Sequence, residues 1–311
     1  MAKILVTGAA GYIGSVMVPR LLAAGHAVLA LDNFMYRQSS LLECCANPRF
    51  DVVRGDCRDR DLLARCLKDV DAVFPLACLT GAPLCNQDPV GATTVIRDAV
   101  RDILKLRSGS QLIIFPTTNS GYGVGEKGKY CTEETPLRPV SLYGRLKVEI
   151  EGELLAADNT VTLRLATVFG ASPRMRTDLL VNDFVFRAVN DRFIVLFEGD
   201  FKRNFLHVRD VADAFLFCLE NFDRLKGRPY NVGLSEANLS KRELCEEIKA
   251  QIPDFHIAEY ALGKDPDKRD YIVSNARIEA AGFKAGRTLR EGIAELIKSY
   301  RLLPKFSYGN V

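Results

Sequence analysis

Thr7-Gly8-Ala9-Ala10-Gly11-Tyr12-Ile13-Gly14 is the stretch that decides the fold of this 311-residue chain. An apolar run, Lys3 to Thr7, precedes it and predicts a buried strand, and Ser15 to Ala24 follow a helical pattern. Gly8 permits a sharp turn, Gly11 permits close approach of a pyrophosphate, and Gly14 permits tight packing of helix on strand. The helix N-terminus favours a bound anion. The stretch therefore predicts a dinucleotide-binding turn whose contact residues are Gly8, Gly11, Tyr12 and Ile13.

A second apolar run, Ala27 to Leu31, ends at Asp32 and indicates which dinucleotide the turn binds. A carboxylate at this strand end accepts hydrogen bonds from the adenosine ribose hydroxyls and repels a 2′-phosphate. We therefore expect NAD as the cofactor, with Asp32 and Asn33 beside its ribose. Arg37 lies close by in the sequence and keeps NADP as the alternative.

Further apolar runs alternate with helical patterns through the first half of the chain. The apolar runs cover 50–54, 72–74, 111–116 and 161–166, and the helical patterns cover 62–67, 90–106 and 142–156. This alternation predicts an α/β fold, a Rossmann-type doubly wound parallel sheet.

Such sheets bind ligands at the carboxyl ends of their strands. We therefore expect Asp56 and Cys57, after the third apolar run, and Leu76 and Ala77, after the fourth, to line the cofactor's path. Asp56 suits the adenine amine or, alternatively, the N-cap of the helix that follows it.

The sequence changes in character after Gly170. Helical patterns cover 179–190, 207–220, 236–252 and 289–303, and a strand pattern covers 192–197. We expect residues 1–170 to form the NAD-binding domain, with 205–233 returning to it. Residues 171–311 should form mainly a smaller C-terminal substrate-binding domain that covers the carboxyl ends of the sheet.

The composition excludes several classes of protein. The net charge of +3 is small and evenly spread, which argues against a nucleic-acid partner. No apolar run approaches the roughly 20 residues of a membrane span, and Met1-Ala2-Lys3 leads into a strand rather than a signal peptide. Nine cysteines without a CxxC motif, together with only three histidines, indicate a reduced cytoplasmic protein with no disulfide framework and no metal site.

Tyr143 and Lys147 are four residues apart within a helical pattern, so their side chains lie on one helix face. A free phenol titrates near pH ~10 and is a poor base at neutral pH. An ammonium group one turn away favours the phenolate, so we expect Lys147 to lower the pKa of Tyr143 and make it a general base. Alone, such a pair is more often a packed tyrosine beside a solvated lysine than a catalytic pair.

Four motifs in a fixed order give the chain its resemblance to a known family. They are TGAAGYIG at 7–14, the threonine-rich turn PTTNSGYG at 116–123, YGRLK at 143–147 and RNFLHVRD at 203–210. In these motifs the whole chain resembles the extended short-chain dehydrogenase/reductases, the group of nucleotide-sugar epimerases and dehydratases.

The resemblance implies roles for individual residues. Thr118 matches the hydroxyl that orients the reacting oxygen, Tyr143 the general acid/base, and Lys147 the lysine that also binds the nicotinamide ribose. Arg203 matches a residue that grips the substrate diphosphate, which suits a guanidinium fork, although a surface arginine is the alternative. Four further positions are implied as substrate contacts: Asn119, Ser120, Asn182 and Arg269. Arg174 and Arg176 either act similarly or belong to a solvated loop.

Departures from the family pattern help to choose the reaction. The 4,6-dehydratases of the family carry an Asp-Glu pair where this chain has Asn119 and Ser120, so the resemblance disfavours dehydration. A cysteine at the position of Ser120 would be typical of 3,5-epimerases. Two family asparagines are replaced by Ile96 and Thr167, which leaves the contacts of the sugar pocket open.

The resemblance implies NAD-dependent oxidation at C4 of a nucleotide-linked sugar to a 4-keto sugar. Stretches such as ATVFGASPRMRTDLLVNDF at 166–184 look most similar to dehydrogenases of GDP-D-glycero-D-manno-heptose in capsule-sugar pathways. A UDP- or GDP-sugar 4-epimerase is the alternative, and a non-catalytic sensor of NAD or nucleotide sugar is the second alternative. We also expect a homodimer, because 90–106 and 142–156 resemble the helices through which the family pairs.

Overall fold

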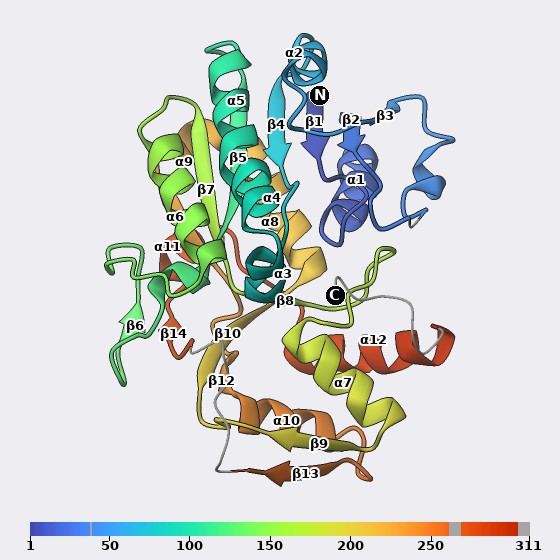
Figure 1. The fold of residues 1–311 in the computed structure, drawn as a ribbon, viewed down its shortest axis with the longest axis vertical. Helices are drawn as coiled ribbons and strands as arrows, with labels where there is room; N and C mark the ends of the chain where they lie inside the picture. Colours follow the sequence, from blue (N-terminus) through green and yellow to red (C-terminus); the bar gives the residue numbers. More distant parts are fainter. Residues whose placement is uncertain (38, 261–268, 304–311) are drawn as a thin grey trace.

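A parallel seven-stranded sheet forms the larger half of the molecule, as a computed structural model shows (Figure 1). The structure describes residues 1–37, 39–260 and 269–303. The strand order is β11-β7-β5-β4-β1-β2-β3, and every neighbouring pair is parallel, which confirms the predicted Rossmann-type sheet. The strands are β1 (Lys3–Thr7), β2 (Ala27–Asp32), β3 (Phe50–Arg54), β4 (Ala72–Pro75), β5 (Leu112–Thr118), β7 (Thr160–Leu165) and β11 (Pro229–Val232).

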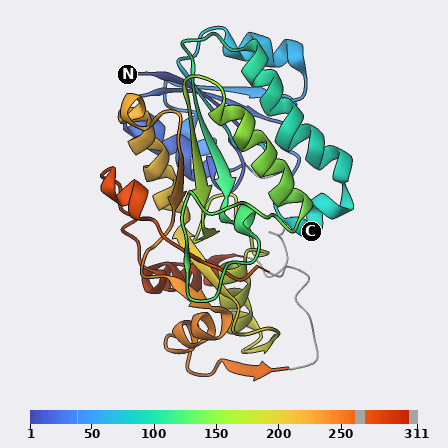
Figure 2. The same ribbon diagram turned by 90° about the vertical axis from the view of Figure 1, so that its left-hand side faces the viewer.

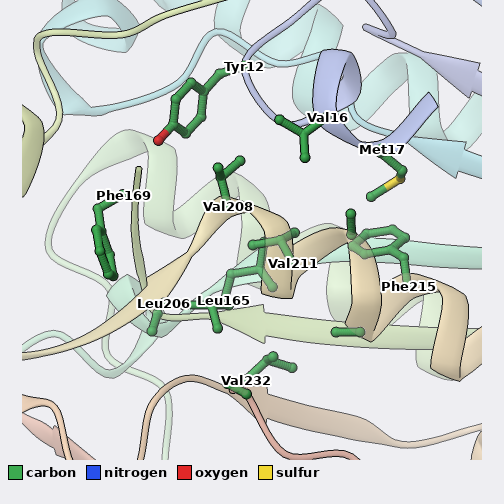
Figure 3. Packing of buried hydrophobic residues seen from close by; sticks show 14 of the residues in the cluster. Tyr12, Val16, Met17, Leu165, Phe169, Leu206, Val208, Val211, Phe215 and Val232 are labelled. Atoms are coloured by element: carbon green, nitrogen blue, oxygen red, sulfur yellow. The ribbon is translucent and has the colours of Figure 1, made fainter. Parts of the chain in front are cut away.

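Helices cover both faces of this sheet because its strands are apolar on both sides. Ile4 and Val6 of β1 pack in one cluster with α1 (Gly14–Ala23) and α8 (Val208–Glu220). Leu5 points to the other face, where its cluster includes α2 (Arg60–Leu67), α5 (Ala99–Leu106) and α6 (Leu142–Leu155). Figure 3 shows Met17 of α1 close to Phe215 of α8, whose ring lies 5.1 Å from that of Phe74.

The smaller half lies beyond the carboxyl ends of the strands (Figures 1 and 2). It contains a three-stranded sheet, two strand pairs and a group of helices. The sheet consists of β8 (Thr167–Phe169), β10 (Lys202–His207) and β12 (Asn238–Ser240), and the pairs are β9 (Phe193–Leu196) with β13 (His256–Glu259) and β6 (Tyr130–Cys131) with β14 (Ile272–Val273). The helices are α7 (Leu180–Asn190), α10 (Lys241–Lys249) and α12 (Leu289–Leu302), whereas α11 (Ala276–Ala280) lies beside β11 of the large sheet.

The chain crosses between the two halves more than once. After β10 it returns through α8 and α9 (Phe222–Leu225) to β11, which pairs with β7 at the sheet edge in the register Pro229↔Thr162. The segment between β7 and β11 is therefore inserted between two strands of one sheet. The domain limits themselves stay a prediction.

Several predicted helices differ from the structure. The pattern over 236–252 is wrong at its start, because 238–240 form β12 and α10 begins only after Ser240, which caps it together with Glu243. The pattern over 90–106 is divided into α4 (Pro89–Thr93), a π-helical turn (Thr94–Asp98) and α5. A short helix, α3 (Ala82–Gln87), and two 3₁₀ turns, Leu42–Cys44 and Asn119–Tyr122, were not predicted. Within the described ranges, no helix has the length and apolar character needed to span a bilayer.

Candidate active site

A cavity of about 540 Å³ lies where the carboxyl ends of the strands meet the smaller half. We call its two regions the glycine-loop end, built around Gly8, Gly11 and Asp32, and the arginine end, built around Tyr143, Arg176, Arg203 and Arg269. Most residues singled out from the sequence line this cavity: Gly8, Gly11, Tyr12, Ile13, Asp32, Asn33, Asp56, Cys57, Leu76, Ala77, Thr118, Ser120, Tyr143, Lys147, Arg203 and Arg269.

The glycine-loop end has the shape that a dinucleotide requires. Gly8 has φ +68°, and a Cβ atom there would lie 2.6 Å from the backbone nitrogen of Ala77. Only glycine is tolerated at this crossing of β1 and the β4 loop. The turn then leads into α1, whose N-terminal N–H groups face an anion favourably. These residues therefore fit NAD, which they would hold through their backbone.

Asp32 is held by backbone hydrogen bonds at the end of β2. Its Oδ2 accepts from the Ala10 nitrogen at 2.9 Å and its Oδ1 accepts from the Phe34 nitrogen at 2.7 Å. A carboxylate has about four acceptor positions, so two remain for ribose hydroxyls. Burial raises the pKa of Asp32 somewhat, and the two backbone donors oppose that shift.

Asp56 lines the cavity but does not cap a helix. Its carboxylate accepts from the Arg58 side chain at 2.6 and 2.9 Å, and these bonds lower its pKa. The cap of α2 is Asp59, whose Oδ1 accepts from the nitrogens of Asp61 and Leu62. The alternative interpretation of Asp56 as the N-cap is therefore wrong, and its contact with adenine stays a prediction.

Tyr12 lines the cavity, while its side chain connects the two halves. The hydroxyl donates to the Gly170 carbonyl at 2.7 Å, and Figure 3 shows the ring directed toward the region of Phe169. Ser172 donates to the Tyr12 carbonyl at 2.7 Å and shares a hydrogen bond with Ser15. The loop after β8 is thus fastened to the glycine loop.

Thr118, Tyr143 and Lys147 all line the cavity. Thr118 ends β5, and Tyr143 lies in the first turn of α6, which Ser141 caps through the Gly144 nitrogen. The Lys147 ammonium donates to the Pro116 carbonyl at 2.8 Å and lies 4.2 Å from the centre of the Phe115 ring. The end of β5 and the first two turns of α6 therefore present the three side chains to one cavity.

The pKa of Tyr143 departs from the expectation. Burial raises the pKa of the phenol, and the thiols Cys78 and Cys85 act in the same direction. The opposing cations are Arg269 and Arg176, while burial lowers the pKa of Lys147 itself. The prediction that Lys147 holds the pKa of Tyr143 below its ordinary value is therefore wrong for this structure, because burial outweighs the nearby positive charge.

A hydrogen-bonded chain leads from Thr118 to the smaller half. The Thr118 hydroxyl donates to the Ser120 Oγ at 3.0 Å, and the Arg269 Nη1 donates to the same oxygen. The Ser120 nitrogen donates back to the Thr118 Oγ1 at 3.1 Å. Ser120 therefore lies between a strand-end hydroxyl and an arginine that is distant in sequence.

The loop before α7 is buried rather than solvated. Arg174 and Arg176 are only 2% and 6% exposed, and both line the cavity. Arg176 forms two hydrogen bonds with Asp178, and the Arg174 guanidinium stacks 3.9 Å from the centre of the Tyr36 ring. The solvated-loop alternative for the two arginines is wrong, as is the surface alternative for Arg203, which is 4% exposed.

Two residues predicted as substrate contacts do not line the cavity. Asn182 is fully buried, and its amide accepts from the Gly170 nitrogen at 3.0 Å and donates to the Arg176 carbonyl at 2.8 Å. Asn119 is buried as well, and its amide has no hydrogen-bond partner within the described part of the chain. Their contact with substrate stays a prediction, and the geometry gives Asn182 a structural role.

The sequence interpretation missed some residues of the cavity. Asp178 could have been found as the acidic partner two residues after Arg176. Tyr36 gave no comparable signal, because a single tyrosine in a loop follows no pattern, whereas Cys78, which follows Leu76 and Ala77 after the fourth apolar run, was expected along the cofactor's path and lines the cavity. Among the described residues, no group of three or more potential ligands could hold a metal ion.

The fold and the site define a class of protein: a Rossmann-type dinucleotide-binding protein in which Thr118, Tyr143 and Lys147 line the same cavity as the glycine loop. Residues 4–233 match the model of the NAD dependent epimerase/dehydratase family, so the chain belongs to this family and its cofactor is NAD.

Relatives of the chain have different activities. It is 30% identical to the UDP-glucose 4-epimerase of Mycolicibacterium smegmatis, with 96% of this chain and 98% of the relative covered. It is 28% identical to UDP-glucuronic acid decarboxylase 1 of Arabidopsis thaliana, with 96% and 70% covered. Among solved structures, the dTDP-glucose 4,6-dehydratase of Streptomyces venezuelae with NAD bound has a TM-score of 0.83 at 26% identity, with 96% and 97% covered.

Proposed function

We propose that the protein oxidises the C4 hydroxyl of a nucleotide-linked sugar to a ketone in an NAD-dependent reaction. The observation that carries this proposal is that Thr118, Tyr143 and Lys147 face the same cavity as the glycine loop. A hydroxyl, a phenol and an ammonium group beside a dinucleotide site are the groups that alcohol oxidation needs.

Each of the three residues has a task in this reaction. Thr118 binds and orients the C4 oxygen, and Tyr143 takes the proton of the C4 hydroxyl. NAD, when bound, accepts the hydride from C4. Lys147, fixed by the Pro116 carbonyl, is placed to bind the nicotinamide ribose.

The carboxylates of the cavity argue against dehydration. Those lining it among the described residues belong to β2, to the turn after β3, and to the loop and first turn of α7; they are Asp32, Asp56, Asp178 and Asp183. The turn that follows Thr118 supplies an amide and a hydroxyl, Asn119 and Ser120, where elimination of water would need an acid and a base.

The proposed substrate is a GDP-linked heptose or hexose. Arg203 and Arg269 at the arginine end suit a diphosphate, because guanidinium groups pair with phosphate oxygens in a bidentate manner. The heptose rests on the resemblance of 166–184 to GDP-heptose C4-dehydrogenases. A 4-epimerase of a UDP- or GDP-sugar is the second candidate, favoured by the M. smegmatis relative. A sensor without catalysis is the third.

The decisive experiment combines Tyr143→Phe with a screen of GDP-, UDP-, CDP- and dTDP-sugars. We expect the wild type to give a 4-keto product two mass units lighter than its substrate, and Tyr143→Phe to lose about 10²- to 10⁴-fold in kcat. An isomer of unchanged mass would establish the epimerase instead, and loss of water would refute the argument from Asn119 and Ser120. Full function in Tyr143→Phe would favour the sensor.

We further propose a cytoplasmic homodimer. Its interface would use α5 and α6, whose outer side carries an ion-pair network of Arg101 with Glu149 and Glu153. A monomeric mass in light scattering at micromolar concentration would contradict this proposal.

A further inference from the structure

We propose that Cys78 and Cys85 form a modification site: a pair of thiols that a peroxide converts reversibly into a disulfide and that bound NAD protects. The site lies in the wall of the cavity, next to Tyr143. This inference goes beyond the proposed C4 oxidation, and it is independent of which nucleotide sugar the enzyme oxidises.

The first support is that the two thiols share one hydrogen-bond acceptor. The Cys85 Sγ donates to the Leu79 carbonyl at 3.0 Å, and the Cys78 Sγ donates to the same oxygen at 3.4 Å. Cys85 belongs to a small apolar cluster, against which Cys78 and Tyr143 also pack. Two sulfurs that donate to one oxygen atom are near neighbours, so a short approach brings them to the S–S bond length of about 2 Å.

The second support is the segment between the two cysteines, which has room to move. Residues 79–84 form the loop after β4 and the first turn of α3. Gly81, in the middle of this segment, has φ +100°, and a Cβ atom there would meet only the Pro83 Cδ, at 3.8 Å. The approach of the two sulfurs can therefore come from this loop and α3, while the sheet stays in place.

The third support is a difference in access, which sets the order of the two steps. Cys78 is partly exposed and lines the cavity, whereas Cys85 is fully buried. Burial raises the pKa of the Cys85 thiol to about 12, so this group remains a thiol. Cys78 lies within electrostatic range of the Lys147 ammonium, and a cationic neighbour is typical of cysteines that react with oxidants. Cys78 is therefore the thiol that meets the peroxide, and Cys85 is the thiol that closes the bridge.

The oxidant of this reaction is a peroxide. Hydrogen peroxide transfers one oxygen atom to the Cys78 sulfur, so that its O–O bond breaks and a sulfenic acid and one water form. The Cys85 sulfur then attacks the Cys78 sulfur. The S–S bond forms, the S–O bond breaks, and the hydroxyl leaves as a second water with the Cys85 proton. The two sulfurs have then lost two electrons to the peroxide, and a thiol reductant returns them by exchange.

Bound NAD should oppose this oxidation, because the thiol pair is part of the cofactor's surroundings. Residues 76–84, which include Cys78, all line the cavity. The backbone of Ala77 is also the group that approaches Gly8 most closely. NAD in the cavity would cover Cys78 and slow its oxidation. The disulfide, in turn, would draw this wall toward α3 and weaken the binding of NAD.

The experiment uses the position of both cysteines in one tryptic peptide, residues 69–97. Reduced wild-type protein is treated with a molar excess of hydrogen peroxide, with or without saturating NAD, and free thiols are alkylated before digestion. We expect the peptide to escape alkylation at both cysteines and to be two hydrogens lighter than its reduced form. Dithiothreitol before alkylation should restore both sites. Saturating NAD should slow the formation of the bridge about tenfold or more.

Three variants separate the bridge from ordinary thiol oxidation. Cys85→Ala should leave Cys78 as a sulfenic acid that dimedone captures, whereas Cys78→Ser should leave Cys85 reduced, because Cys85 is buried. Cys45→Ser removes an exposed thiol and is the control, which should form the bridge as the wild type does. Fluorescence titration should show that peroxide weakens NAD binding about tenfold in the wild type and leaves the affinity of Cys78→Ser unchanged.

The inference is overturned if peptide 69–97 is still alkylated at both cysteines after a dose of peroxide that oxidises Cys45. It is overturned as well if Cys85 is oxidised as fast in Cys78→Ser as in the wild type, or if NAD leaves the rate of bridging unchanged. If Cys85→Ala does not fold, the wild type and Cys78→Ser decide, because both are read from the same peptide. These measurements need no sugar substrate, so the failure of this inference and the failure of the proposed function are distinguishable.

Discussion

At the glycine-loop end of the cavity the contacts come from backbone turns, whereas at the arginine end they come from long charged side chains. Gly8 and Asp32 are fixed by neighbouring strands and by bonds to main-chain nitrogens. Arg176 and Arg269 reach the cavity from loops, where Arg176 pairs with Asp178 and Arg269 donates to Ser120. The glycine-loop end is therefore built from features of the Rossmann-type fold itself, whereas the side chains of the arginine end can be replaced without altering the sheet.

The largest effect should follow Gly8→Val, which attacks the rigid end. The new side chain would meet the Ala77 backbone and adopt a φ of +68°, so we expect a loss of roughly 2 to 6 kcal/mol in unfolding free energy and no retained NAD. Urea unfolding and native mass spectrometry measure the two quantities. Gly25→Val is the matched control, because Gly25 also has a positive φ but no atom lies within 4 Å. NAD retained by Gly8→Val would contradict the proposed cradle.

Arg176→Gln should act only at the arginine end. Removing the guanidinium leaves Asp178 unpaired in the cavity, so we expect nucleotide-sugar binding to weaken about 10- to 100-fold while bound NAD stays unchanged. Calorimetric titration with GDP measures the binding of the nucleotide, and the amount of NAD bound to the purified variant is measured separately. Arg242→Gln is the control, because it removes an exposed arginine whose acidic partners, Asp200 and Glu259, do not line the cavity. A variant that loses NAD as well would show that the two ends are not independent.

Asp32→Asn should have a smaller effect at the glycine-loop end. An amide keeps one acceptor oxygen for the two backbone donors, Ala10 and Phe34, and loses the charge, so NAD affinity should fall about tenfold. The same change removes the repulsion of a 2′-phosphate, so NADP should gain relative to NAD. Fluorescence titration with both cofactors tests this. Asp51→Asn, an exposed change on β3, should leave both affinities as they are.

The smallest effect concerns the acid stability of the arginine end. Burial would raise the pKa of Asp178, but the hydrogen bonds and charge of Arg176 outweigh it and leave the pKa lowered. A carboxyl with a lowered pKa in the folded state contributes stability above its unfolded pKa, near ~3.9, and that stability is lost as pH falls through the lowered pKa.

Asp178→Asn should therefore lose less than about 1 kcal/mol at neutral pH and flatten the fall in stability between about pH 5 and pH 2. Urea unfolding across this range measures it. Asp223→Asn, at a 96% exposed side chain, should leave the slope unchanged. If the unfolding free energy fell equally steeply with pH in the wild type and in Asp178→Asn, Asp178 would not be the source of this acid sensitivity.

The sequence predicted the glycine-loop end well because its determinants are local. A strand, a glycine turn and a helix follow each other within about twenty residues, as the βαβ rule requires. The start of α10 was predicted wrongly although its signal is also local. Ser240 and Glu243 form a capping box that marks this start, but the helical pattern over 236–252 begins before it.

The arginine end could not be predicted in the same way. Arg174 packs against Tyr36, and Arg176 pairs with Asp178. No sequence spacing predicts the contact between Arg174 and Tyr36, because the two residues are far apart in the chain. The resemblance placed Asn182 with the substrate, whereas its amide is occupied by Gly170 and Arg176. The effect of Lys147 on Tyr143 was misjudged because helical spacing shows a neighbouring charge but not the cost of burial.

The return of the chain to the sheet at β11 limits how this enzyme can be recombined. Because β11 pairs with β7, a chimera joined once near residue 170 would combine the edge strand of one parent with the sheet of another. Specificity should instead be exchanged as two inserts, one between β7 and α8 and one after β11, with α8 and β11 kept from the parent that supplies the sheet. Libraries built with two crossovers should therefore yield far more folded members than libraries built with one.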